Sequence, residues 1–266
     1  MKQKVIFIMG LGHSGSTFLQ LLLSSHPSII GFGEIALLLK TLKNQSAPFD
    51  LPNCSCGKKP QQCEVWNKFL LDYNPNMTNK ELYLSIIKLF QVHFPGKILI
   101  DSSKNLDSFK EYYSTYDKNL IDLKVIFLSR DFRGWINSRK KNNKRKNRKD
   151  YGLLFNSYKW FYRNFRKLKF LKKINQDFLS INYETLVFNT DQTFKKILHY
   201  LELDFMEPDL EKACTHDIFG NRMKNDKKKN TKVYYDHKWM KENNTVLLYP
   251  LLIPPYYLNK KLYSSD

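Results

Sequence analysis

Short, continuous apolar runs recur along the chain, and polar residues follow each of them. The four runs span residues 4–9, 97–100, 123–128 and 178–181. Runs of this length, rich in β-branched and aromatic residues, are typical of strands buried on both faces. Segments with a helical pattern separate them, at residues 16–23, 80–92, 104–114, 133–141, 154–172 and 190–201. This alternation predicts an α/β fold in which a parallel central sheet has helices on both faces.

The polar residues at the strand ends indicate where such a protein binds its ligand. A glycine-rich segment follows the first strand, and Asp101–Lys104, Ser129–Asp131 and Asn182–Glu184 follow the other three. Ligands of parallel sheets bind at the carboxyl ends of the strands. We therefore expect these four segments to meet at one site.

We expect a single domain that spans residues 1–266. The segment at about 45–65 is rich in Pro and Cys and interrupts the alternation of strands and helices, which predicts an irregular insertion. The last forty residues are rich in Lys, Asn and Tyr and contain a Pro-Pro pair. We expect them to wrap the domain without forming another one.

Composition places the chain among globular proteins. Hydrophobic residues make up 42% of the sequence and aromatic residues 15%, which excludes a disordered chain. We expect a soluble protein, because no window approaches the 18 consecutive apolar residues of a membrane-spanning helix. Four cysteines are too few for a secreted disulfide framework and indicate free thiols in a reducing cytoplasm.

The net charge of +19 is concentrated in two runs. Residues 139–149 hold eight cations and no anion, and residues 222–232 hold six cations and one Asp. Such runs indicate either a surface that binds a polyanion or a pair of solvated Lys/Asn-rich loops. The sequence leaves both interpretations open.

The first strand leads into Gly10–Thr17, which nearly matches the phosphate-loop pattern G-x-x-x-x-G-K-[ST]. Ser16 stands where nucleotide triphosphatases carry the lysine that bridges the β- and γ-phosphates, which argues against ATP or GTP hydrolysis. Backbone N–H groups at a helix N-terminus bind a phosphate without that lysine. The sequence therefore predicts a phosphate-loop architecture that holds an anion.

Three segments resemble motifs of sulfotransferases that use 3′-phosphoadenosine 5′-phosphosulfate (PAPS). The sequence GLGHSGSTFLQLLLSSHP from Gly10 is similar to the family's 5′-phosphosulfate loop. Val125–Ser138 is similar to its 3′-phosphate segment, and the residues from His216 to Met223 to its glycine-plus-cation motif. The order and separation of the first two are specific. The resemblance is patchy between residues 40 and 95 and after residue 235.

This resemblance implies a set of donor-binding residues. Those expected at the 5′-phosphosulfate are Gly12, His13, Ser14, Gly15, Ser16 and Thr17. Those expected at the 3′-phosphate are Arg130, Ser138, Gly220, Asn221 and Arg222. Tyr183 resembles the tyrosine whose ring stacks on adenine, although a tyrosine in the core at a strand end is equally ordinary.

Catalysis of sulfuryl transfer needs a base for the acceptor hydroxyl and a cation near the leaving oxygen. Glu34 resembles the catalytic glutamate of tyrosylprotein sulfotransferases and is the expected base, with His13 and His26 as rivals. His13 stands where many members carry Lys or Arg beside the leaving phosphate. Lys104 is the expected substitute. The alternative for Glu34 is a helix N-cap or ion-pair residue, and for Lys104 a surface lysine.

The resemblance therefore implies a PAPS-dependent sulfotransferase with an unidentified acceptor. The nucleotide is the donor, 3′,5′-bisphosphoadenosine (PAP) is the product, and no metal is required. The acceptor is a hydroxyl compound, anionic if the basic runs act on it, such as a carbohydrate, lipid or peptide. The alternatives are a phosphate-loop nucleotide or nucleoside kinase, disfavoured by Ser16, and a non-enzymatic nucleic-acid-binding protein, for which no RNA-binding motif is present.

The cysteines allow one further hypothesis. Cys54, Cys56 and Cys63 have a spacing similar to a zinc knuckle. No well-spaced fourth ligand follows them in the sequence, so the pattern falls short of a closed tetrahedral site. Similar cysteine clusters occur in bacterial sequences that resemble sulfotransferases, and this resemblance implies a structural insertion near the acceptor site, with a zinc site as the alternative.

Overall fold

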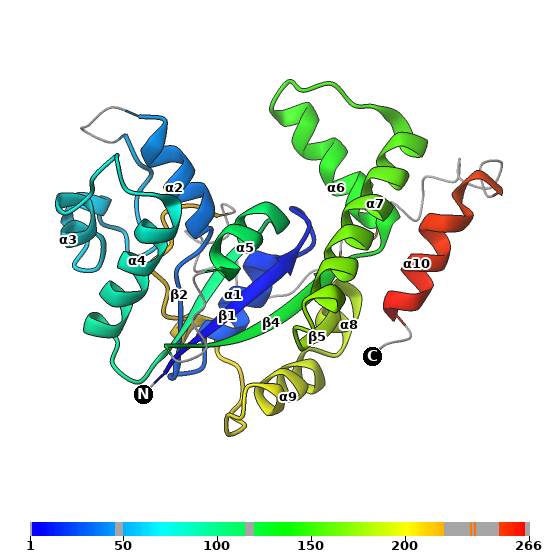
Figure 1. The fold of residues 1–266 in the computed structure, drawn as a ribbon. Coiled ribbons are helices and arrows are strands. Elements are labelled where there is room, and N and C mark those ends of the chain that lie inside the picture. The colour runs from blue at the N-terminus through cyan, green and yellow to red at the C-terminus, as the bar shows by residue number, and fades with distance from the viewer. Residues whose placement is uncertain are drawn as a thin grey trace.

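The computed structural model describes residues 2–45, 50–114, 120–220, 235, 237 and 250–263. Its centre is one five-stranded sheet, in which the strand order is β2-β3-β1-β4-β5 and neighbouring strands pair in parallel (Figure 1). The strands are β1 (Gln3–Gly10), β2 (Ile29–Gly31), β3 (Ile98–Lys104), β4 (Ile121–Ser129) and β5 (Phe178–Asn182). The prediction of an α/β fold with a parallel sheet is confirmed.

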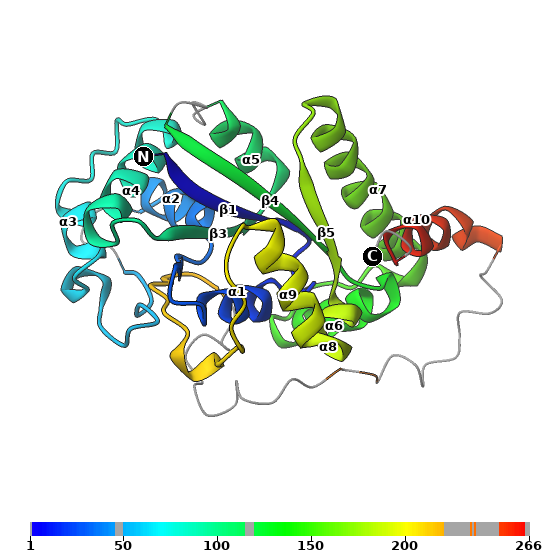
Figure 2. The same cartoon turned by 90° about the horizontal axis from the view of Figure 1, so that it is seen from below.

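Alternating residues of the strands build two apolar cores, one on each face of the sheet. On β1, Val5 and Phe7 belong to one core and Ile6 and Ile8 to the other. The first core includes residues of α2 (Ile35–Lys43), α4 (Asn79–His93), α5 (Leu106–Tyr113) and α7 (Gly152–Lys173). The second includes residues of α1 (Ser16–Ser24) and α9 (Thr190–Tyr200). Figure 2 shows the two groups of helices on opposite sides of the sheet.

The remaining elements lie at the ends and edges of this framework. They are the 3-10 turns η1 (Pro60–Gln62) and η2 (Leu210–Lys212), and the helices α3 (Trp66–Leu71), α6 (Phe132–Arg145), α8 (Tyr183–Phe188) and α10 (Ile253–Tyr263). Helix α10 packs beside α7 (Figure 1). Its Tyr256 ring lies 4.9 Å from the ring of Phe132, and Asn259 donates a 3.0 Å hydrogen bond to Asp131. The C-terminal helix thereby supports the start of α6.

The structure differs from the sequence-based expectation at several elements. Strand β2 and helix α2 were not predicted, and they place Glu34 at the N-cap of α2. The helix expected at 104–114 begins at Leu106, and Lys104 is the last residue of β3. Helix α6 continues to Arg145, so much of the first basic run is helical and not a loop. The second basic run lies outside the described residues.

Within the ranges that the structure describes, no helix has both the length and the apolar character that a membrane crossing needs.

Candidate active site

A candidate site residue lies at or just after the carboxyl end of each strand. β1 ends at Gly10, which begins the glycine loop (Gly10–Thr17), and Glu34 follows β2. Lys104 ends β3, Arg130 follows β4 and Tyr183 follows β5. The expected convergence of the strand ends is therefore confirmed, and β2 adds a fifth contributor.

The glycine loop is held through its carbonyl oxygens. Three side chains donate to them: Trp135 Nε1 to Gly12 at 2.7 Å, Arg130 Nη1 to His13 at 3.2 Å, and Lys167 Nζ to Gly10. Helix α1 begins directly after Gly15, and no side chain caps its N-terminus. The first N–H groups of a helix have no acceptor within it, and they carry the positive end of its dipole. The loop and α1 therefore form a site suited to an anion.

Arg130 lies beneath this loop. Its guanidinium stacks on the Tyr183 ring, 4.4 Å from the centroid, and Trp160 Nε1 donates to its carbonyl oxygen at 3.0 Å. The residue is 6% exposed. Its Nε and the hydroxyl of Ser14 are buried and have no hydrogen-bond partner among the described residues. Unsatisfied buried donors are costly, so these two atoms favour a ligand at this edge.

Cations converge on His13. Burial, and to a lesser extent the positive charges of Lys104, Arg139, Arg130 and Lys146, lower the pKa of this imidazole to about 4. His13 is therefore neutral at neutral pH while no anion is bound, and the positive charge at the site belongs to its neighbours. The first basic run contributes to this field through Arg139 and Lys146.

Glu34 and Lys104 form an ion pair at this edge, with 2.7 Å between Oε1 and Nζ. Their side chains are 23% and 12% exposed. Lys104 has a φ of 64°, in the left-handed region that residues with a side chain rarely adopt. The Glu34 N–H donates to the carbonyl oxygen of Phe219 at 3.3 Å. Both residues expected to act in catalysis thus lie together, partly accessible to solvent.

The remaining expected residues are placed with less detail. Ser138 lies half-buried on α6, eight residues after Arg130, and Gly220 is exposed beyond Phe219. Asn221 and Arg222 lie outside the described residues. His26 follows the far end of α1, where its Nδ1 accepts a hydrogen bond from the Ser28 N–H. The structure does not bring this rival base to the site.

Lys167 is a contributor that the sequence analysis missed. It lies on α7, is buried, and reaches across to Gly10. Burial, with a smaller contribution from the positive charge of nearby Arg163, lowers the pKa of its amine to about 7. In the sequence it is one of many lysines within a helical pattern, and nothing in that pattern distinguishes it.

Comparisons with known proteins give the family and the fold of this chain. The model of the sulfotransferase family matches residues 5–207. A sulfotransferase domain from the curacin biosynthetic pathway is 21% identical, with a TM-score of 0.59 and 98% of each chain covered. The sulfotransferase domain of the Synechococcus PCC 7002 olefin synthase is 19% identical, with a TM-score of 0.59, 99% of this chain and 96% of that chain covered.

A sulfotransferase from Alicyclobacillus acidocaldarius is 14% identical, with a TM-score of 0.50, 98% of this chain and 97% of that chain covered. At these identities the structural likeness shows the fold, whereas the family model matches the sequence itself. A search of curated proteins finds no match to this chain. The match over residues 5–207 covers most of the sequence, and the chain therefore belongs to the sulfotransferase family.

Proposed function

We propose that this protein transfers a sulfuryl group from PAPS to the hydroxyl group of an acceptor. The observation that carries the proposal is the Glu34–Lys104 pair beside the glycine loop. A carboxylate and a cation next to an anion site are the groups that this displacement needs.

The donor binds along the carboxyl edge of the sheet. The N–H groups of the glycine loop and α1 hold the 5′-phosphosulfate, and the Ser14 hydroxyl gains a partner there. Arg130 and Ser138 hold the 3′-phosphate, and the free Nε of Arg130 supports this role. Arg130 already stacks on Tyr183, so Tyr183 acts first as the support that orients the guanidinium.

In the chemical step the acceptor oxygen attacks the sulfur atom, and the bond between sulfur and the bridging phosphate oxygen breaks. The acceptor proton passes to the Glu34 carboxylate. Negative charge develops on the leaving phosphate, where Lys104 stabilises it. His13 carries no charge at neutral pH in the free protein and contributes mainly through its place in the loop. The products are the sulfated acceptor and PAP, and the step needs no metal.

The acceptor site lies near the basic end of α6. Lys144 and Arg145 are exposed there, and Arg139 and Lys146 extend the positive charge toward His13. This arrangement favours an acceptor that carries negative charge besides its hydroxyl group, such as an acidic carbohydrate, lipid or peptide.

Nucleotide selectivity tests the donor assignment. We expect PAP to bind far more tightly than AMP or ATP in isothermal titration calorimetry. Arg130→Gln should weaken PAP binding by about 10–100-fold, because it removes a charge-assisted hydrogen bond. Arg145→Gln is the matched control, because Arg145 is exposed on α6 and bonds to Asn142. Equal affinities for PAP and ATP would overturn the donor assignment and favour a kinase.

A further inference from the structure

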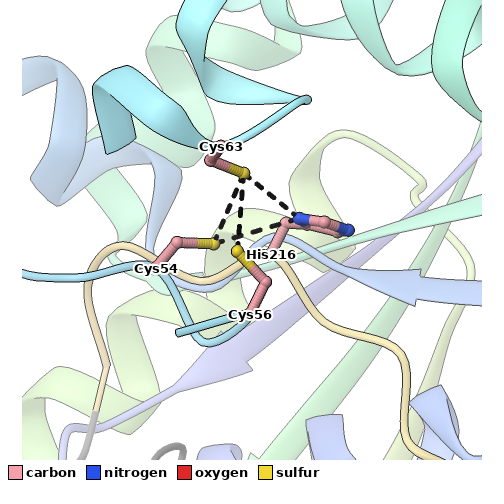
Figure 3. Close-up of side chains that lie close together, drawn as sticks. All are labelled: Cys54, Cys56, Cys63 and His216. Carbon is pink, nitrogen blue, oxygen red and sulfur yellow. Dashed lines mark hydrogen bonds between the residues drawn. The ribbon is translucent and has the colours of Figure 1, made fainter. Parts of the chain in front are cut away.

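The side chains of three cysteines and one histidine converge in the structure (Figure 3). They are Cys54, Cys56, Cys63 and His216, and their ligand atoms all lie within 4.8 Å of one another. The insertion contributes the three thiols, and His216 comes from the segment that precedes Gly220. The fourth ligand is not apparent from the spacing of the cysteines, because His216 follows Cys63 by 153 residues.

Four of the six distances between the ligand atoms are close to those of a tetrahedral metal site, and none of the six exceeds 4.8 Å. Cys63 Sγ lies 3.7 Å from Cys56 Sγ and 3.8 Å from Cys54 Sγ. His216 Nδ1 lies 3.5 Å from Cys63 Sγ and 3.9 Å from Cys54 Sγ. In a tetrahedron with zinc–sulfur bonds of about 2.3 Å and zinc–nitrogen bonds of about 2.05 Å, the sulfurs lie about 3.8 Å apart and sulfur and nitrogen about 3.5 Å apart. A disulfide would need about 2.05 Å, and all four cysteines of the chain are free.

The surrounding backbone is built to hold these ligands. The Cys54 N–H donates to Lys58 and the Gly57 N–H to Cys54, which closes the turn that carries the first two thiols. Backbone N–H groups of Val65 and Trp66 donate to the Cys63 sulfur. Hydrogen bonds of this kind stabilise a thiolate and orient it toward a metal.

His216 is fixed from the other side of the cluster. The backbone N–H of His216 donates to the Gly31 carbonyl oxygen at 2.7 Å. Trp66 Nε1 donates to the carbonyl oxygen of His216, also at 2.7 Å. Ser55 Oγ donates to Thr215 and accepts from the Asp217 N–H, each at 2.8 Å. Hydrogen bonds from Ser55 and Trp66, which precede and follow the third cysteine of the cluster in the sequence, thus join the insertion to the segment around His216.

We propose that Cys54, Cys56, Cys63 and His216 bind one zinc ion. Three thiolates and one imidazole in a tetrahedron are a ligand set that zinc prefers. The three thiol protons pass to solvent on binding, and no atom changes its oxidation state. Four protein ligands leave no position for water, so the ion is structural.

The ion would stabilise the backbone beneath Glu34. The segment that it anchors continues from His216 to Phe219, whose carbonyl accepts the Glu34 N–H. Zinc therefore fixes the insertion and this segment against β2 and the start of α2. The zinc assignment itself does not depend on the proposed sulfuryl transfer.

Metal content tests the proposal directly. We expect the full chain, purified under reducing conditions and dialysed, to hold one zinc per molecule by inductively coupled plasma mass spectrometry. Cys56→Ser should weaken zinc binding by at least about 100-fold, because it removes a ligand from the least buried position of the cluster. Cys214→Ser is the control for the loss of a thiol. Cys214 is exposed, lies outside the four ligands and hydrogen-bonds to His216, a contact that a serine hydroxyl can keep, so this variant should retain stoichiometric zinc.

Cobalt binding decides the question even if Cys56→Ser fails to fold. The wild-type protein, stripped of metal and titrated with Co²⁺, should develop thiolate-to-cobalt charge-transfer bands and the visible bands of tetrahedral cobalt. One equivalent of zinc should abolish both. Wild-type protein that binds neither metal, a disulfide within the cluster in the intact protein, or zinc retained at full affinity by folded Cys56→Ser would overturn the proposal.

Discussion

Gly15 in the glycine loop has no room for a side chain. Its φ is 95°, and a Cβ atom there would lie 2.3 Å from Cδ2 of Tyr183. We expect Gly15→Ala to destabilise the protein by about 1–3 kcal/mol, since it adds backbone strain and displaces the ring beneath Arg130. Thermal unfolding measures this loss.

Gly12→Ala is the matched control for stability. Within the described residues, no heavy atom lies within 4 Å of the position that a Cβ at Gly12 would take. Its melting temperature should therefore stay close to that of the wild type. If both alanine variants unfold at the same temperature, the contact between Gly15 and Tyr183 does not constrain the loop.

His13 makes stability depend on pH. The pKa of this half-buried imidazole is about 4 in the folded protein, against the ordinary histidine value of 6.5. Between these two values the unfolded chain binds more protons than the folded chain, so the free energy of unfolding decreases as the pH falls through this window. We expect His13 to account for about 1–3 kcal/mol of this decrease, because the residue is partly exposed and solvent screening reduces its contribution.

His13→Asn isolates this effect, since asparagine tolerates the positive φ of 74° at this position. Urea unfolding of both proteins from pH 7.5 to 4, without a bound anion, should show a smaller loss of stability in the variant. Other titrating groups are common to both proteins and cancel in the difference. A difference that stays constant over this range would contradict the assignment.

At the scale of elements, the sequence predicted the parts with a strong local pattern. The cores of β1, β3, β4 and β5 are continuous apolar runs, and the polar residues after them mark the carboxyl edge. Strand β2 has three residues, too few for a pattern. Residues 35–43 are largely apolar, and such a run is compatible with a buried strand as well as a helix.

Contacts between distant elements could not be predicted from sequence spacing. Glu34 and Lys104 are 70 residues apart in the sequence, and their ion pair depends on β2 lying beside β3. Lys167 reaches Gly10 because α7 packs over β1. His216 joins the cysteines through the pairing of its segment with Gly31. Local periodicity carries no information about these approaches.

Helix α6 carries much of the basic run at residues 139–149, and the binding of polyanions to this run can be tested. Lys144, Arg145 and Arg148 are exposed at or beyond its C-terminal end. Replacing all three by Ser should lower the salt concentration that elutes the protein from heparin, because exposed charges act over about 8 Å at physiological ionic strength. The affinity for PAP should stay nearly unchanged, since Arg139 and Lys146 remain beside His13.

A second triple variant controls for charge alone. Lys169, Lys172 and Lys173 are exposed toward the C-terminal end of α7. Their replacement by Ser removes the same charge at another place and should change the elution less. Equal shifts for the two variants would mean that heparin responds to net charge and not to a surface near the site.

For the whole molecule, the central claim is that the carboxyl edge of one sheet assembles a base, a cation and an anion site for sulfuryl transfer. The most direct measurement is the transfer of radiolabelled sulfur from PAPS to an acceptor library by the wild type and by Glu34→Gln. We predict label transfer by the wild type and a rate lower by roughly 10²-fold or more in the variant, with nearly unchanged PAP affinity. Absence of labelled product with the wild type, or equal rates for the two proteins, would contradict the account.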